Sequence, residues 1–482
     1  MIDQFIKFVL IFLIVFTPIA FGSMELWAFS LMELGILLMV ILVTVQSLGR
    51  SSPDIFPSDS STRIPRLTIP LVFLGLFLLF VLFQLLPLPS SVIKIISPNT
   101  FKLRESLSIA DLQVSLMGGR GSLSFVPFGT EIEFLKWLAL GGLFFALLRW
   151  GLREGTHFVT HAMIVVMILI GVTEALYGLF EFFSGHRYIL YLDRSSTMTA
   201  VTGTFINRNY FAGYLLLVIP TSVGFLVARQ ARRPGGKYGW RHRLSSVDGK
   251  SLLIGYAIII MILALLFSSS RMGITSLLIS LTLMLLLFRD PKRGERFFRI
   301  SFLIPAMAFV WAAWIGLDAV ISRFFSPAED FHQRWMVWTD TFRILKDFPL
   351  FGSGLGTFLH IFPMYQSFHI EGIFTHAEND FLQLASDVGL VGIGLLSVIF
   401  FYLFLRGILG IRSLSPRNPE KYVGMGGLVG TLALLFHSTV ERNIQVPANA
   451  FLFTFLLAMV LTISHRGQSY RETGQKAAPN GQ

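Results

Sequence analysis

Long apolar stretches recur along nearly the whole chain, and their spacing predicts membrane-spanning helices. A spanning helix needs about 20 mostly apolar residues to cross roughly 30 Å of hydrocarbon. The pattern predicts about twelve such helices, near residues 4–22, 27–48, 68–88, 132–149, 158–183, 205–228, 251–268, 272–288, 300–320, 389–410, 424–440 and 447–464. We interpret the first as a retained helix rather than a signal peptide, because no small-x-small cleavage pattern follows it.

Composition agrees with lipid as the main solvent of this chain. Hydrophobic residues make up 54% of the 482 residues, charged residues only 14%, and the mean hydropathy is +0.68. A water-soluble globule of this length does not carry such values. The predicted fold class is therefore all-α, a polytopic integral membrane protein without a free-standing soluble domain. The absence of cysteine excludes disulfides and thiolate metal sites.

The net charge of +11 is informative through the positions of the basic residues. Most of them lie in alternate connections between the predicted spans, and the positive-inside rule makes these the cytoplasmic loops, with both termini cytoplasmic. We interpret the basic loops as topology determinants in contact with anionic membrane lipids, and predict no nucleic-acid partner. The opposite side gains long segments at 89–131 and 321–388, where we expect the function.

The chain divides into four segments by this pattern. Residues 1–200 hold the first helices and a loop, and residues 201–410 form a core that contains the large loop 321–388 before the tenth span. Residues 411–464 form the last helices. The polar tail 465–482 has no apolar period and is predicted to be disordered.

The large loop begins with a pattern typical of a helix that lies on a membrane surface. Between Arg334 and Lys346, one helix face carries Trp335, Trp338, Phe342 and Leu345. Pro349 ends this helix, and the glycine-rich residues 352–356 follow. Two interpretations of these glycines are open, a plain turn and a loop whose backbone N–H groups wrap a phosphate.

The end of the same loop carries a polar row that predicts a helix from His376 to Asp387. His376, Asn379, Asp380, Gln383 and Asp387 share one side of it, and Glu378 lies near its start. Such a cluster at a membrane boundary is costly unless it is paired or solvated, which makes it a candidate functional site. The alternative is an N-terminal capping arrangement.

Two further polar insertions face the same side. Asn207 and Arg208 open the sixth span, and Arg271 ends a serine turn between the seventh and eighth spans. Because guanidinium forks suit phosphate oxygens, Arg208, Arg271 and Arg334 are candidates to converge on one anionic group. The alternative for each is contact with lipid headgroups. We interpret Glu441 and Arg442, between the last two spans, as a structural ion pair.

Four ordered pieces of the chain resemble the O-antigen ligase and polymerase family of bacterial envelope proteins. They are GTFINRNYFAGYL, SSSRMG, RWMVW…DFPLFGSGLGTF and HAENDFLQLASDVGLVG, within about residues 200–410. The resemblance implies a metal-independent glycosyltransferase without a cofactor, at the periplasmic face of the inner membrane. Its donor would be a glycan on undecaprenyl diphosphate, and Arg208, Arg271 and Arg334 would hold the diphosphate.

The sequence departs from the family at one position. The family commonly has a histidine where this chain has Glu378, while His376 stands two residues earlier. The base in a single inverting displacement is therefore Glu378, His376 or both, and we favour Glu378 with His376 supporting. Asn379, Asp380 and Asn207 are supporting residues.

The acceptor stays open at this point. It is a lipid A-core sugar if the enzyme is a ligase, or the growing glycan if it is a polymerase. The alternative from another class is a lipid-linked glycan transporter or flippase, which would also be polytopic.

Overall fold

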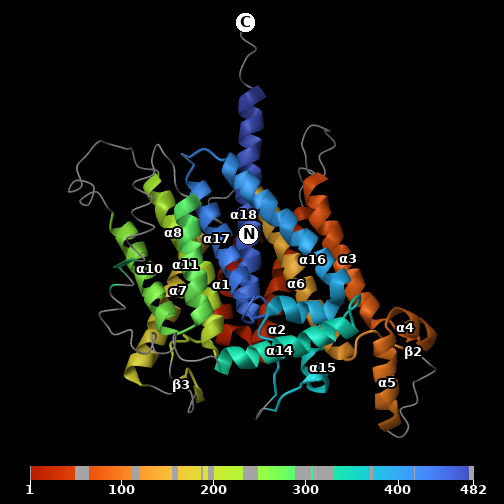
Figure 1. The fold of residues 1–482 in the computed structure, drawn as a ribbon. Coiled ribbons are helices and arrows are strands. Elements are labelled where there is room, and N and C mark those ends of the chain that lie inside the picture. Colours follow the sequence, from red (N-terminus) through yellow and green to blue (C-terminus); the bar gives the residue numbers. More distant parts are fainter. Residues whose placement is uncertain are drawn as a thin grey trace.

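The computed structural model describes residues 2–48, 65–110, 120–154, 161–185, 188–193, 200–231, 248–287, 306–307, 310, 329–369, 373–416 and 418–476. Long helices packed side by side make up most of it (Figure 1). They are α1 (Ile2–Ile19), α2 (Leu26–Leu48), α3 (Pro65–Leu85), α6 (Pro127–Glu154), α7 (Met163–Ser184), α8 (Arg208–Ala231), α10 (Gly249–Phe267), α11 (Arg271–Leu287), α16 (Asp380–Ser413), α17 (Pro419–His437) and α18 (Pro447–Lys476).

Among the described residues, seven helices are long and apolar enough to cross a membrane: α1, α2, α7, α8, α10, α16 and α18. Helices α3 and α11 contain shorter apolar segments. These helices confirm the all-helical, polytopic character. The count of about twelve spans stays a prediction, and the span predicted at 300–320 falls almost wholly outside the described residues.

Strands are minor in the described part of the chain. Strand β1 (Leu88–Pro89) pairs antiparallel with β2 (Arg120–Gly121), and β3 (Tyr188–Ile189) pairs with β4 (Leu192–Asp193). Two short helices, α4 (Ser90–Ile96) and α5 (Pro98–Ala110), follow β1. They occupy part of the segment 89–131, in which the sequence predicts a loop.

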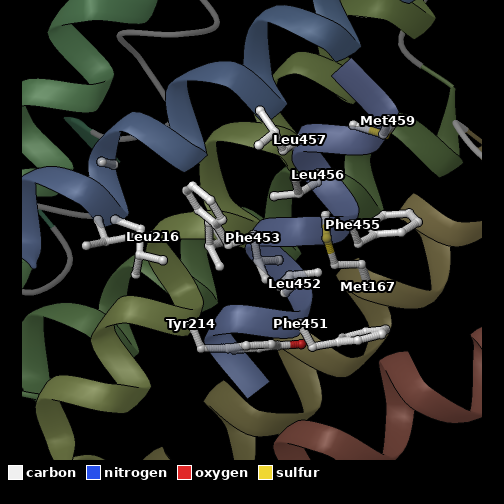
Figure 2. Close-up of a cluster of buried hydrophobic side chains, with 14 of the residues drawn as sticks. Met167, Tyr214, Leu216, Phe451, Leu452, Phe453, Phe455, Leu456, Leu457 and Met459 are labelled. Atoms are coloured by element: carbon white, nitrogen blue, oxygen red, sulfur yellow. The ribbon is translucent and has the colours of Figure 1, made fainter. Parts of the chain in front are cut away.

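Helices α8 and α18 form the centre of the bundle. Their apolar segments are buried almost completely within the protein, and Figure 2 shows aromatic and aliphatic side chains of α18 beside Tyr214 and Leu216 of α8. Helix α17 lies against α8 at very short range, because Gly426 faces the carbonyl of Pro220, where a side chain would clash. Small residues allow this close approach between helices in a membrane protein.

One end of the bundle carries the shorter helices α14 (Glu329–Asp347) and α15 (Phe358–Tyr365), and we call it the α14 end. In Figure 1, α14 runs crosswise to the long helices. Helix α14 confirms the helix predicted over residues 334–346. Its inner face joins a small separate core, and its outer face exposes aromatic side chains. The core contains Val337, Ile344, Phe348, Phe358, Ile361 and Phe362, and the exposed side chains are Phe331, Trp335 and Phe342.

The glycine-rich loop at residues 352–356 packs against a break in α16. Gly389 has φ +62°. The N–H of the next residue, Leu390, donates to the carbonyl of Pro349 at 2.8 Å. The loop packs so tightly on this break that a Cβ at Gly352, where φ is +70°, would lie 2.2 Å from the carbonyl oxygen of Asp387. Glycine is required where φ is positive and backbones approach this closely.

The backbone N–H groups of this loop are used within the protein. Those of Ser353 and Gly354 donate to carbonyls of α16 at 3.0 Å, and that of Gly356 donates to the Asp387 carboxylate at 3.0 Å. The N–H of Leu355 donates to Gln84 at 3.2 Å. The interpretation as a phosphate-wrapping loop is therefore wrong, and the plain turn is confirmed.

Helix α18 extends further than the sequence predicts. It continues to Lys476, past residue 465, where the sequence places the start of the polar tail. Starting a helix is the costly step, and the apolar segment Pro447–His465 has already formed this one. Each further residue orders only its own backbone and gains one hydrogen bond. The extension contains Gln, Arg, Glu and Lys, which favour helix formation, and the first proline, which would end a helix, is Pro479.

Candidate active site

The buried carboxylate of Asp380 fixes the geometry of the α14 end. Asp380 is the first residue of α16, and one of its oxygens accepts the N–H groups of Asn443 and Ile444 at 2.7 Å each. Its own N–H donates to the carbonyl of Ser438 at 3.0 Å. Because an anion at a helix start also meets the positive end of the helix dipole, this arrangement holds residues 438–446 against α16.

The segment before α16 is fixed by neighbouring side chains. Asn379 caps the helix by accepting the N–H of Leu382 at 3.0 Å, which confirms a capping role for this residue. The carbonyl of Ala377 accepts the indole N–H of Trp338 at 3.0 Å, and its N–H donates to Gln383 at 3.0 Å. The helix predicted from His376 starts later, so His376 and Glu378 lie on this short segment.

Glu378 has a strained backbone. Its φ is +51°, a left-handed conformation that costs a non-glycine residue roughly 1–3 kcal/mol. Strain of this kind persists where the surroundings fix it, and it is common at functional sites. The carboxyl group of Glu378 lies close enough to Glu441 to raise the pKa of the Glu441 carboxyl group.

Arg334 binds the segment that follows α17. Its guanidinium forms an ion pair with Glu441 at 2.5 Å and donates to the carbonyl of Val440 at 2.6 Å. Glu441 is almost fully buried, with 5% of its side chain exposed, whereas Arg334 is 23% exposed. Glu441 therefore pairs with Arg334, and not with its neighbour Arg442 as the sequence suggests.

Arg442 points to the other side and contacts His376. One guanidinium nitrogen meets Nε2 of His376, and Arg442 also forms a hydrogen bond with Tyr210. Burial, together with the nearby charges of Arg442 and Lys136, lowers the pKa of His376 to about 2. The imidazole is therefore neutral at physiological pH.

Arg208 and Arg271 lie at the α14 end as well. They are the first residues of α8 and α11, and both are half-buried. The two helix starts adjoin, because a Cβ at Gly273 would lie only 2.8 Å from the Cβ of Ala212. Asn207 stabilises the start of α8 by accepting the N–H of Asn209 at 2.8 Å. The structure thus brings Arg208, Arg271 and Arg334 to the same end of the bundle.

A cavity of about 790 Å³ begins beside this cluster and continues between α3, α6, α16 and α18. Its polar part, at the α14 end, includes Asn207, Tyr210, Glu133, Lys136, His376, Asp380 and Arg442. The rest, which we call the apolar corridor, includes Leu74, Trp137, Phe144, Phe145, Leu396, Phe400, Leu403, Phe453 and Leu457. The whole cavity, polar part and corridor together, follows α16 from Asp380 to Leu403 for at most about 35 Å, comparable to the thickness of a bilayer core.

Only some of the site residues predicted from the sequence line the described cavity. His376, Asp380 and Asn207 line it, while Arg208, Arg271, Arg334 and Glu378 lie outside its described lining. Sequence reasoning missed Lys136 and Glu133, which lie on an ordinary-looking span, and assigned Arg442 only to an ion pair. Glu133 and Lys136 are a charged pair inside a predicted span, and this pattern could have indicated a functional role for Lys136.

Within the described residues, no group of three or more His, Cys, Asp or Glu side chains is placed to hold a metal ion. The cations of the site are arginines and a lysine.

Residues 256–397 match the O-antigen ligase family model. The matched segment runs from α10 through α14 to the middle of α16, and it contains Arg271, Arg334, His376 and Glu378. The family resemblance seen in the sequence is therefore confirmed. A comparison with curated proteins finds no match.

The Arg334–Glu441 pair predicts a pH-dependent stability. Burial raises the pKa of Glu441, and Arg334 opposes that rise. A raised pKa means that Glu441 stabilises the fold when protonated and that this contribution is lost as the pH rises through its folded-state pKa. Arg334→Met removes the compensating cation, so its deficit should be small at about pH 6 and should reach about 2 kcal/mol or more at about pH 9.

Thermal unfolding in detergent at several pH values measures this deficit. Arg334→Met/Glu441→Gln should show little pH dependence, and Lys346→Met, an exposed cation on the same helix, serves as the control. A deficit of Arg334→Met that is equal at all pH values would contradict the assignment.

Proposed function

We propose that this protein is a membrane glycosyltransferase that moves a glycan from an undecaprenyl-diphosphate carrier to an acceptor hydroxyl. The observation that carries the proposal is the shape and polarity of the cavity. A polar head with cations joins an apolar corridor, and the two together follow α16 over a length of up to about a bilayer core, which matches a lipid with an anionic headgroup and a hydrocarbon chain. The O-antigen ligase family match supports the same reaction class.

The acceptor in this proposal is a sugar of lipid A-core, as in a ligase. We place the protein in the bacterial inner membrane, with the α14 end at the periplasmic face and both termini cytoplasmic. The basic residues support this orientation, since Arg149 and Arg153 lie near the end of α6 and bond to Ser47 and Gln46 near the end of α2.

The reaction is an inverting displacement in one step. The acceptor hydroxyl gives its proton to Glu378, supported by His376, and its oxygen attacks the anomeric carbon of the donor sugar. The bond from that carbon to the diphosphate oxygen breaks, and the electron pair leaves on undecaprenyl diphosphate. Arg208, Arg271 and Arg334 stabilise the charge that develops there, with no metal ion or cofactor required.

The support for Glu378 as the base is its place beside Glu441, which Arg334 holds by an ion pair. The strained backbone of Glu378, with φ +51°, is of the kind found at functional sites. His376 lies closer to the cavity, but its lowered pKa makes it a weak proton acceptor before substrate binds.

A polymerase is the nearest alternative, because it uses the same donor and differs only in the acceptor. The glycan profile of a deletion strain separates the two. Loss of long chains with accumulation of full-length carrier-linked glycan indicates a ligase, whereas accumulation of single repeats indicates a polymerase.

One observation favours a transporter or flippase as the alternative from another class. The break of α16 at Gly389, beside a cavity that follows the same helix, resembles the discontinuous helices of transporters. In this protein the charged groups of the candidate site, Lys136, His376 and Arg442 among them, lie at one end of the bundle, which favours catalysis at that end.

Incubation of the purified protein with lipid-linked glycan and acceptor in detergent micelles tests the proposed function. Because micelles have no compartments, transport cannot produce a new glycoside there. We expect a product in which the glycan is joined to the acceptor, with release of undecaprenyl diphosphate. Absence of product with a protein that is folded and binds the donor would favour the transporter.

Substitution of Glu378 tests the assignment of the base. Glu378→Gln keeps the size of the side chain and removes its basicity, so glycan transfer should fall at least about a hundredfold. His376→Gln, assayed in parallel, should cost less. If Glu378→Gln loses less than about tenfold, His376 is the base instead.

A further inference from the structure

Two cations from different elements line the polar part of the cavity. Lys136 belongs to α6, and Arg442 belongs to the segment between α17 and α18. His376 lies within the electrostatic reach of both. Neither cation is part of the segment that matches the ligase family, so the family match gives them no role.

Lys136 has a counterion that also lines the cavity. Its ammonium group forms an ion pair with Glu133 at 2.6 Å, one helical turn away, and only 7% of its side chain is exposed. A buried ammonium needs such a partner, because desolvation of an unpaired charge is costly. Since both groups line the cavity, an anion that enters it competes with Glu133 for Lys136.

Arg442 retains an unsatisfied donor. Its Nε is buried and has no hydrogen-bond partner within the described part of the chain, although its other nitrogens contact His376 and Tyr210. Buried polar groups are nearly always hydrogen-bonded, and a guanidinium has five N–H donors and no acceptor. The missing partner is therefore an acceptor, and phosphate oxygens fit a guanidinium fork.

We propose that Lys136 and Arg442 hold the diphosphate of the lipid-linked donor between them, at the entrance of the apolar corridor. This inference rests on the proposed function, because it names how that function's donor is bound. A diphosphate esterified at both ends carries two negative charges, which two cations match. The hydrocarbon chain then continues along the corridor between α6 and α16.

This arrangement separates binding from catalysis. Lys136 and Arg442 hold the two charges that the donor has before reaction. The third charge appears only as the glycosidic bond breaks, and its stabilisation is left to Arg208, Arg271 and Arg334. Interactions present before reaction lower KM, and those that form only in the transition state raise kcat.

Equilibrium binding of undecaprenyl diphosphate to the purified full-length protein in detergent tests the proposal, with undecaprenol as the uncharged comparison. Lys136→Met and Arg442→Met should each weaken diphosphate binding by about tenfold or more, the typical value of one charge-assisted hydrogen bond. Binding of undecaprenol should change little. Lys346→Met, an exposed cation of α14 outside the cavity lining, is the control and should bind like the wild type.

Glu133→Gln provides a test that misfolding cannot imitate. It removes the internal competitor for Lys136, so diphosphate binding should tighten by about threefold. Weaker binding by Glu133→Gln, or wild-type binding by Lys136→Met, would overturn the proposal.

Kinetics distinguish failure of this proposal from failure of the proposed function. If glycan transfer occurs and neither Lys136→Met nor Arg442→Met raises KM, the function stands and the two-cation site fails. If the binding results hold and no variant or wild type transfers glycan, the diphosphate site stands and the transferase fails.

Discussion

The carboxylate of Asp380 is the contact on which the α14 end depends. By accepting two backbone N–H groups of residues 438–446, it joins the start of α16 to the segment between α17 and α18. This contact acts together with the Arg334–Glu441 ion pair and the Gln383–Gln445 hydrogen bond to place Glu441 and Arg442 beside Glu378 and His376. The position of the buried Asp380 anion at a helix start offsets part of its desolvation.

The charges at this end fall into two groups on either side of the 376–378 segment. On one side, Arg334, Glu441 and Glu378 lie together, with Glu441 almost fully buried. On the other, Arg442 and Lys136 line the cavity and act electrostatically on His376. In the function we propose, the first group holds and passes a proton, and the second binds an anion. The apolar corridor begins at the second group, which is where a lipid headgroup would meet its chain.

Much of this architecture was predictable from the sequence. Apolar stretches of span length predicted the helical membrane fold, and the pattern of Trp335, Trp338 and Phe342 predicted α14. The order of the polar motifs predicted the family and that Arg208, Arg271 and Arg334 reach one end. The capping role of Asn379 and the plain turn at residues 352–356 were each among the alternatives considered.

The remaining features depend on contacts between distant segments, which no local pattern encodes. The partner of Glu441 is Arg334, more than a hundred residues away, because the 438–446 segment turns Arg442 toward the cavity. The place of Lys136 follows only from the packing of α6 against α3 and α18. The break at Gly389 depends on the loop at residues 349–356, because carbonyl groups of that loop accept backbone N–H groups of α16 there.

The central claim is that the apolar corridor holds the hydrocarbon chain of a lipid whose anionic head lies beside His376. Photo-crosslinking with a polyprenyl diphosphate that carries a photoreactive group within its chain tests this directly, when adducts are mapped by mass spectrometry of the purified protein. Two neighbouring residues of α16 provide the contrast, since Phe400 lines the corridor and Phe401 is 77% exposed on the outside of the bundle. The account predicts adducts on Phe400 and on corridor residues of α6 and α18. Adducts confined to Phe401 and other outward-facing side chains would contradict it.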